Sequence, residues 1–429
     1  MSSDVYVLII GFVVLLALGF PVAWSIGIAS LLTMLVSIDT LPAITTVAQR
    51  MATGLDSFTL LAIPFFVLAG QVMSQGGIAR RLIDFAKGLV GSLPGGLAHV
   101  NVVAAMLFGA ISGSALAAVT SIGGTLGKRM EEEGYSREFA AAINITSATT
   151  GLVIPPSNIL IVYSLASGGV SIASLFLAGY IPGILTGLAL MLVAAYWAKK
   201  YKYPVAERSS FKKILFEFVD ALPSLFLLVV VIGGIVTGIF TATEASGVAV
   251  LYTLILASIY MELTLDKLRG IFLNSVTTTA VVMLLIGTSM SMSWVMSYAD
   301  IPQTMSNVLL DLSDNKIIIL IIINITLLCV GVFMDMTPAV LIFTPIFLPV
   351  VKDLGMDPIH FGIIMVMNLC IGLCTPPVGS VLFVGVGVAN TTITKVIKPM
   401  IPLFIAMIVV LFIVTYVPEL ALWLPSIFE

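Results

Sequence analysis

Charged side chains are scarce in this sequence. Lysine, arginine, aspartate and glutamate make up 10% of its 429 residues, against roughly 25% in soluble domains. The net charge is only −3 and no basic tail is present, so nothing in the composition points to nucleic-acid binding. The mean hydropathy is +1.17, and uncharged apolar runs recur along the chain. This pattern predicts a polytopic α-helical membrane protein.

Residues that carry out catalysis or bind metals are also few. The three cysteines are odd in number and lie in apolar segments, which favours packing over a disulfide or metal role. There is no H-E-x-x-H motif, and Gly127-Lys128 lacks the rest of a phosphate-binding loop. Ser112-Gly113 resembles a buried nucleophile, but Gly109 is one residue too far away for G-x-S-G. We therefore expect no enzyme activity, no ATP use and no cofactor.

Two adjacent prolines interrupt an apolar run twice. The first interruption is Gly151–Asn158, and the second, Gly372–Gly379, follows 221 positions later. Proline removes a backbone donor and prevents a regular helix. A helix broken at membrane depth frees carbonyl groups that lipid cannot satisfy. Two such breaks, one in each half of the chain, indicate a midplane binding site in a secondary transporter.

Other features repeat at the same offset. Gly134, for example, aligns with Gly355. We interpret the chain as an internal duplication, with a first repeat at 1–198, a linker at 199–220 and a second repeat at 221–429.

Each half also contains an apolar stretch that is too interrupted for one clean span. In residues 97–127 the interruption is Gly109–Ser114, and in residues 317–350 it is Gly331–Pro338. A re-entrant helical hairpin with its tip in the membrane fits both stretches. The broken helices that follow occupy residues 138–167 and 359–389.

The distribution of basic residues predicts how the repeats are oriented. We assume a periplasmic N-terminus, about five crossings per half and one hairpin per half that does not cross. Sixteen of the nineteen lysines and arginines then face the cytoplasm, all but Arg50, Lys316 and Lys352, as the positive-inside rule requires. Because each half crosses an odd number of times, the second repeat is inverted relative to the first.

The hairpin tips and breaks carry the candidate ligands. Ser112, Gly113 and Ser114, with the carbonyls freed around Gly151–Pro156, offer neutral oxygen atoms. Such a set suits a monovalent cation better than calcium or magnesium, which usually recruit carboxylates. The alternative is a plain kink whose hydroxyls bond back to the helix.

Two acidic residues fall within apolar segments. A carboxylate in a membrane hairpin costs on the order of 3 kcal/mol by insertion scales, so Asp335 is a candidate for cation or substrate binding. The alternative is a helix cap, because Asp335 precedes Thr337-Pro338 as a cap precedes an N1 proline. Glu244 lies outside the hairpins, and we expect it to brace the scaffold or a partner helix.

These motifs together resemble the large membrane subunit of tripartite ATP-independent periplasmic (TRAP) transporters, over essentially the whole chain. The residues that carry the resemblance are Gly109-x-x-Ser112-Gly113-Ser114, Gly151-Leu152-Val153-Ile154-Pro155-Pro156-Ser157, Gly331-x-x-x-Asp335-x-Thr337-Pro338 and Thr375-Pro376-Pro377-Val378-Gly379. Within the family the chain looks most like the sialic-acid branch.

The resemblance implies a sodium-coupled importer in which a transport domain moves like an elevator against a scaffold domain. Sodium would be the coupling ion, bound at two related sites with the substrate between them. The first sodium site would comprise Ser112, Gly113, Ser114, Gly151, Ile154 and Pro155. The second would comprise Gly331, Asp335, Thr337, Gly372, Thr375 and Pro377. The substrate residues would be Ser157, Asn158, Asn368, Val378, Gly379 and Ser380.

The resemblance also implies partners and a location. A periplasmic binding protein would deliver an organic acid, which we expect to be sialic acid, with a C4-dicarboxylate or another carboxylate as the alternative. A small four-helix membrane subunit, expected as a separate chain, would pack on the scaffold in the bacterial inner membrane. No lysine or arginine falls within the two broken segments to meet a carboxylate. The other classes considered, a passive channel and an intramembrane hydrolase, are disfavoured.

Overall fold

The structure, a computed structural model, describes residues 3–203, 210–313, 315–377 and 379–428. Within these ranges every regular element is a helix, which confirms the predicted all-α class. Eight helices of the described chain are long and apolar enough to cross a membrane. The pair Arg137–Val153 and Asn158–Ala166, bent by 51°, makes a ninth if it is counted as one span.

The first half contains eleven α-helices and one 3-10 helix among its described residues. They are α1 (Ser3–Ala17), α2 (Val22–Ser37), α3 (Thr40–Leu55), η1 (Phe58–Leu61), α4 (Ala62–Gln75), α5 (Ile78–Val90), α6 (Gly96–Ser112), α7 (Ala115–Glu132), α8 (Arg137–Ala148), α9 (Thr150–Val153), α10 (Asn158–Ala166) and α11 (Ile172–Tyr201).

The second half follows a similar order. Its described helices are α12 (Phe211–Val236), α13 (Ala242–Ile259), α14 (Leu265–Tyr298), α15 (Ile301–Leu312), α16 (Lys316–Phe333), α17 (Met336–Asp353), α18 (Pro358–Leu373), α19 (Ser380–Val388), α20 (Ile393–Tyr416), α21 (Glu419–Leu422) and α22 (Pro425–Phe428). The predicted hairpins correspond to α6–α7 and α16–α17, and the predicted broken helices to α8–α10 and α18–α19.

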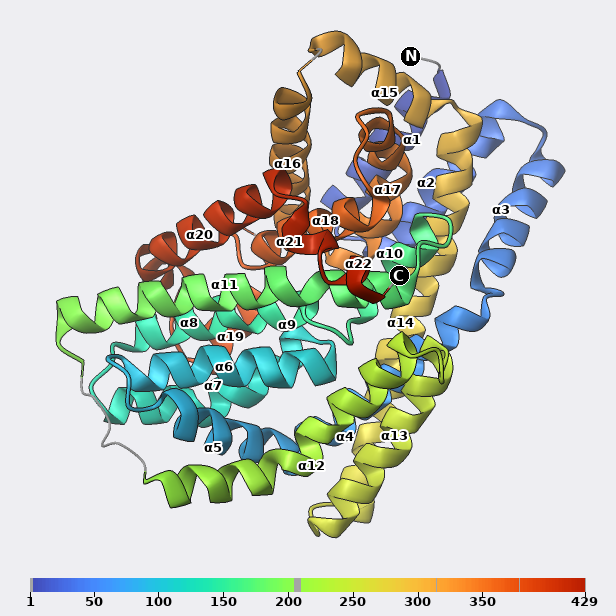
Figure 1. Cartoon of the computed structure of the whole chain (residues 1–429). Coiled ribbons are helices and arrows are strands. Elements are labelled where there is room, and N and C mark those ends of the chain that lie inside the picture. The colour runs from blue at the N-terminus through green and yellow to red at the C-terminus, as the bar shows by residue number, and fades with distance from the viewer. Residues whose placement is uncertain (1–2, 204–209, 314, 378, 429) are drawn as a thin grey trace.

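The two halves interleave rather than pack as separate bodies. Helix α7 of the first hairpin packs against α19 of the second half, and α17 of the second hairpin packs against α10 of the first half. Outside the hairpins, α13 contacts α4 while α2 contacts α14. Figure 1 shows the resulting arrangement, with α6, α7, α8 and α11 stacked on one side and α3, α13 and α14 steeply inclined on the other. The contacts of one half therefore have counterparts in the other.

Two helices lie outside the predicted hairpins and broken helices, and one of them begins inside the predicted linker. Helix α3 occupies residues 40–55, where it buries Ala43 and Val47 and packs against α14. Helix α12 begins at Phe211, inside the predicted linker, where Lys213 and Glu217 form an ion pair of 4.0 Å one turn apart. Charged residues at this spacing support a helix as well as a loop, which is why composition alone did not find its start.

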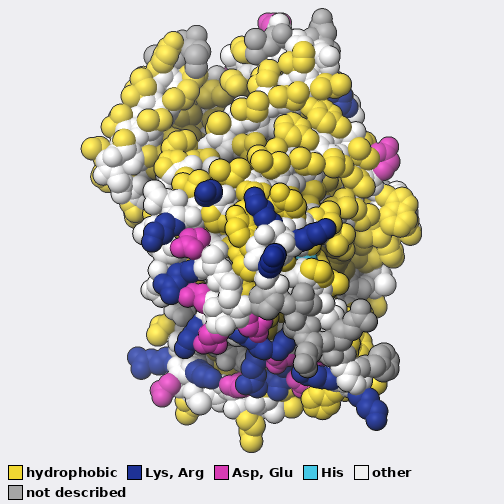
Figure 2. All heavy atoms as spheres, turned by 90° about the vertical axis from the view of Figure 1, so that its left-hand side faces the viewer, with side chains coloured by type: hydrophobic (Ala, Val, Ile, Leu, Met, Phe, Trp, Pro, Cys, Tyr) yellow, Lys and Arg dark blue, Asp and Glu magenta, His cyan; other side chains and the backbone are white. Residues whose placement is uncertain are grey.

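On one face of the molecule, charged side chains gather toward one end. Figure 2 shows lysine, arginine, aspartate and glutamate concentrated over the lower part of one face, with hydrophobic side chains over the upper part. This face is the side on which α11 ends and α12 begins (Figure 1). The charged part of this face therefore lies on the side of the molecule where α11 ends and α12 begins.

Glu244 has a structural role in the first turn of α13. The backbone N–H of Thr241 donates to the Glu244 carboxylate at 2.8 Å, and the Thr241 hydroxyl accepts from the Glu244 N–H at 3.2 Å. This reciprocal pair is a capping box. Replacing Glu244 by alanine removes the acceptor for the Thr241 N–H and should lower the melting temperature in detergent. Glu244→Gln, which keeps the acceptor, should melt close to wild type. Loss of function in either variant without a lower melting temperature would contradict a purely structural role.

Candidate functional site

The first break lies between α8 and α10. Helix α8 ends at Ala148, the single turn of α9 follows, and the backbone becomes extended at Ile154 (φ −79°, ψ 125°). The hydroxyl of Ser157 spans the break and donates a hydrogen bond of 2.5 Å to the carbonyl oxygen of Leu152. Because this segment is buried, the break is a fixed part of the interior.

The tip of the first hairpin lies next to this break. Gly113 ends α6 with φ +59°, a conformation that favours glycine. Ser114 begins α7, and its hydroxyl accepts a hydrogen bond from the first turn of that helix. A Cβ atom added to Gly109 would lie 2.6 Å from the Cα of Gly151. The hairpin arm and the broken helix therefore touch backbone to backbone.

The second break repeats this arrangement. Helix α18 ends at Leu373, and the Thr375 hydroxyl donates 2.7 Å back to the carbonyl of Ile371. A Cβ atom added to Gly331 would lie 3.1 Å from the Cα of Gly372. In both halves a glycine on the first hairpin arm therefore meets a glycine just before the break.

Asp335 is at the tip of the second hairpin, at the N-cap position of α17. Its side chain makes no capping hydrogen bond to α17, and its one neighbouring donor is the backbone N–H of Met336, the first residue of that helix. The residue is exposed although its neighbours Met336 and Pro338 are buried. The carboxylate is therefore available to another ligand.

The tips and the broken helices converge on one cavity of about 170 Å³. Six predicted site residues line it: Gly113, Ser114 and Asn158 from the first half, and Asp335, Thr337 and Ser380 from the second. The Oδ1 atom of Asn158 is buried without a hydrogen-bond partner. This oxygen can therefore accept a hydrogen bond from a bound substrate or coordinate a cation. No lysine or arginine occurs among the lining residues that the structure describes.

Other predicted residues lie outside the lining. The Ser157 hydroxyl is hydrogen-bonded to the carbonyl of Leu152 across the break. The Asn368 amide donates a hydrogen bond of 2.6 Å to Oδ1 of Asn324. The predicted residues that do not line the cavity are Ser112, Gly151, Ile154, Pro155, Ser157, Gly331, Asn368, Gly372, Thr375, Pro377 and Gly379. Val378 lies outside the described residues.

One wall of the cavity escaped the sequence prediction. Thr278 and Val282 of α14 line it, as do Ile63 and Val67 of α4. The available signal was the run of three threonines at 277–279 within an apolar span. Hydroxyl groups in such a span often face other helices or a cavity rather than lipid. The apolar members of this wall carry no distinguishing pattern.

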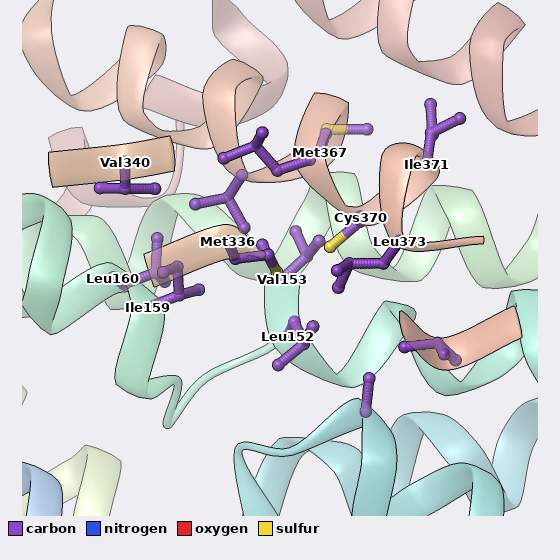
Figure 3. Close-up of a cluster of buried hydrophobic side chains, with 14 of the residues drawn as sticks. Leu152, Val153, Ile159, Leu160, Met336, Val340, Met367, Cys370, Ile371 and Leu373 are labelled. Atoms are coloured by element: carbon purple, nitrogen blue, oxygen red, sulfur yellow. The ribbon is translucent and has the colours of Figure 1, made fainter. Parts of the chain in front are cut away.

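Apolar side chains from both halves pack around the breaks. Figure 3 shows Leu152 and Val153 of the first break near Met336 of the second hairpin and Leu373 of the second broken helix. The thiol of Cys370 donates to the carbonyl oxygen of Thr149 at 3.4 Å. Similarly, the Cys374 thiol donates to the carbonyl of Ile145 at 3.4 Å. Cys370 and Cys374 thus pack the two halves together, as the sequence predicted, whereas Cys329 is exposed.

A solved transporter shares the fold. The YdaH transporter of Alcanivorax borkumensis superimposes with a TM-score of 0.65 over 90% of this chain and 89% of that chain, at 14% identity. At this identity the likeness concerns the fold alone.

Sequence relatives are much closer. The chain is 56% identical to the uncharacterized protein YgiK of Salmonella typhimurium, over 99% of this chain and 98% of that protein. It is 42% identical to the isethionate TRAP transporter permease protein DctMQ of Oleidesulfovibrio alaskensis, over 96% of this chain and 65% of that longer protein. It is 38% identical to the sialic acid TRAP transporter large permease protein SiaM of Vibrio cholerae, over 98% of both.

Residues 9–420 match the family described as the DctM component of tripartite ATP-independent periplasmic transporters. The predicted family is thereby confirmed. The predicted absence of enzyme activity agrees with it, because relatives in this family are named as transport permeases. The chain therefore belongs to the DctM family, the large membrane permease subunits of TRAP transporters.

Proposed function

We propose that this chain is the permease of a sodium-coupled importer that carries an organic acid across the bacterial inner membrane. The observation that carries the proposal is the cavity in which Asp335 and the hairpin tips of both halves meet. A carboxylate that lines a transport cavity without a basic partner would repel an anionic substrate. A bound cation removes that repulsion, so the acid and the cation would enter together.

Sodium suits the available ligands. The first ion would sit near Ser112, Gly113 and the carbonyls freed at the first break. The second would sit near Asp335 and Thr337, beside the second break. Each set supplies mainly neutral oxygen atoms, with at most one carboxylate, which favours a monovalent over a divalent ion. The glycine contacts Gly109–Gly151 and Gly331–Gly372 bring each tip close to its break.

The energy available is sufficient for uptake without ATP. Two sodium ions moving down a tenfold gradient release about 2.8 kcal/mol. One net positive charge crossing about 100 mV adds roughly 2.3 kcal/mol. The total of about 5 kcal/mol would concentrate an acid several thousandfold.

The substrate is proposed as an organic acid, with sialic acid as the first compound to test. Relatives of comparable identity are named for isethionate and for sialic acid, so identity alone does not select one acid. The cavity offers hydroxyl and amide groups from Ser114, Asn158 and Ser380, which would pair with hydroxyl groups on the substrate as well as with its carboxylate.

The partners follow from the family. TRAP large permeases work with a small membrane subunit and a periplasmic binding protein. For this chain we propose a separate small four-helix subunit on the scaffold helices α1–α4 and α12–α14. The N-terminus would be periplasmic, and the hairpins and broken helices would move as one transport domain against the scaffold. Their interleaved packing across the halves supports a single moving body.

Uptake into proteoliposomes tests the proposal directly. The chain is reconstituted with its small subunit, and its binding protein is added outside together with labelled sialic acid, isethionate or a C4-dicarboxylate. We expect one acid to accumulate only with inward sodium and the binding protein, and not when choline replaces sodium. Accumulation of an acid that is indifferent to sodium would contradict the coupling. Equilibration without accumulation would indicate a passive channel.

A further inference from the structure

Each hairpin is joined to its broken helix by a buried polar contact in the same relative place. In the first half the Ser147 hydroxyl on α8 donates 2.8 Å to Oδ1 of Asn101 on α6. In the second half the Asn368 amide on α18 donates 2.6 Å to Oδ1 of Asn324 on α16. Ser147 and Asn368 are 221 positions apart, which is the offset between the two breaks. The donors are therefore counterparts within the repeat, and the acceptors Asn101 and Asn324, 223 positions apart, both lie on the first arm of their hairpin.

All four side chains are buried, with at most 1% of their surface exposed. Water cannot replace a lost partner at such a site, so removing one side chain leaves the other unsatisfied. Ser147 and Asn368 also donate to backbone carbonyls one turn earlier, those of Asn144 at 3.3 Å and Ile364 at 2.9 Å, but these bonds stay within their own helix. These bonds therefore fix how each hairpin arm lies on its broken helix.

The two bonds also have the same sequence spacing from the glycines that contact each other at the breaks. Each donor precedes the glycine of its broken helix by four residues, as Ser147 precedes Gly151 and Asn368 precedes Gly372. One helical turn is about 3.6 residues, so each bond lies one turn from the backbone contact between hairpin and break. The hairpin glycine in turn precedes its tip by four residues, from Gly109 to Gly113 in the first half.

We propose that Ser147 and Asn368 are positioning residues that set the sodium affinity of the two sites without touching the ion or the substrate. The proposal rests on the proposed sodium-coupled function. The hydrogen bond fixes the first hairpin arm against the broken helix. One turn further on, the contact between the two glycines keeps the same spacing. The hairpin tip is thereby held next to the carbonyls of the break. Asn368, which the sequence suggested as a substrate ligand, acts in this account through Asn324.

We call the Ser147–Asn101 and Asn368–Asn324 hydrogen bonds the two clamps. Neighbouring hydrogen bonds connect each clamp to a further helix. In the first half Asn144 donates 2.8 Å to the carbonyl of Val119 on α7, and it also accepts from Asn101 at 3.5 Å. In the second half Asn324 donates 3.4 Å to the hydroxyl of Thr415 on α20. In each half these bonds thus join the first hairpin arm and the broken helix to a third helix, α7 in the first half and α20 in the second.

A double-mutant cycle between Asn324 and Asn368 tests the proposal. The variants are Asn324→Ala, Asn368→Ala and the double variant, with Asn307→Ala, an exposed asparagine on α15, as the control. Initial uptake rates give the sodium concentration for half-maximal rate at saturating acid, and the KM for the acid at saturating sodium. We expect each single variant to raise half-saturating sodium about tenfold, which corresponds to about 1.4 kcal/mol. The double variant should be no more than about twofold worse than either single variant.

The conservative variant separates positioning from direct binding. Asn368→Ser places at this position the residue found at its counterpart, Ser147. It keeps a donor for Asn324 and removes the Asn368 Oδ1, which is buried without a partner. We expect its half-saturating sodium to fall within about threefold of wild type. A role as substrate ligand predicts instead that Asn368→Ser and Asn368→Ala both raise the KM for the acid, while Asn324→Ala does not.

Several outcomes would overturn the proposal. The first is that the increases in half-saturating sodium caused by Asn324→Ala and Asn368→Ala multiply in the double variant, which would make them independent. The second is a raised KM for the acid while half-saturating sodium is unchanged. If Asn368→Ala does not fold, Ser147→Ala carries the test, because Asn101 then keeps its bond to Asn144; an unchanged half-saturating sodium would refute the clamp. A wild-type protein whose uptake ignores sodium would refute the proposed function itself, which is a distinguishable result.

Discussion

Replacing Asp335 by asparagine is expected to lower sodium-driven uptake about 100-fold, which corresponds to about 2.8 kcal/mol. The carboxylate lines the cavity and makes no capping bond to α17, so its charge is available to a cation. A contact between unit charges at 4 Å is worth about 4 kcal/mol at an effective dielectric constant near 20. Asparagine keeps the size and one oxygen ligand but removes the charge. Initial rates of uptake at several sodium concentrations measure the loss.

Asp357→Asn is the matched control for this variant. Asp357 also precedes a helix, α18, but its carboxylate caps that helix by accepting 2.6 Å from the N–H of Ile359. Asparagine is as good a cap as aspartate, so uptake by Asp357→Asn should stay close to wild type. Equal losses in the two variants would mean that Asp335 matters only as a helix-terminal residue, which is the capping alternative.

Replacing Gly109 by alanine is expected to cause the second large loss. The added Cβ would lie 2.6 Å from the Cα of Gly151, a distance that two backbones can relieve only by separating. Overpacking of this kind typically costs 1–3 kcal/mol, and here the shift falls on the contact that places the first hairpin tip. We expect a lower melting temperature and an uptake rate reduced at least tenfold, measured in detergent and in proteoliposomes respectively.

Gly127→Ala on the other arm of the same hairpin is the control. A Cβ atom at Gly127 meets nothing within 4 Å, and alanine favours a helix over glycine by up to about 1 kcal/mol. This variant should therefore melt at or above the wild-type temperature and transport normally. If Gly109→Ala behaves like Gly127→Ala, the backbone contact does not position the tip.

The sequence was sufficient to locate the hairpins and the breaks because their signals are local. Pro155-Pro156 and Pro376-Pro377 cannot continue a helix, and the glycines around Ser112 interrupt an apolar run. The structure breaks the helices at both positions and brings the tips beside them. The offset of 221 also anticipated that the two halves would make equivalent contacts.

The roles of individual polar residues could not be predicted in the same way. Asn158 and Asn368 both lie near a break, yet Asn158 lines the cavity whereas Asn368 bonds to Asn324. The difference depends on which neighbour faces each side chain, and that follows from tertiary packing. The contribution of Thr278 was missed for the same reason, because α14 reaches the cavity through its packing against α4 and α17.

Cysteine labelling of the cavity from both halves tests the central claim most directly. Ser114→Cys and Ser380→Cys are made separately in a Cys329→Ser background, which removes the exposed native thiol and leaves the two buried ones. Thr125→Cys, exposed on α7 and outside the cavity lining, is the control. If both halves build one chamber for sodium and the acid, sodium with the transported acid should slow labelling at positions 114 and 380 together and leave position 125 unchanged. Protection of only one half, or of neither, would contradict the account.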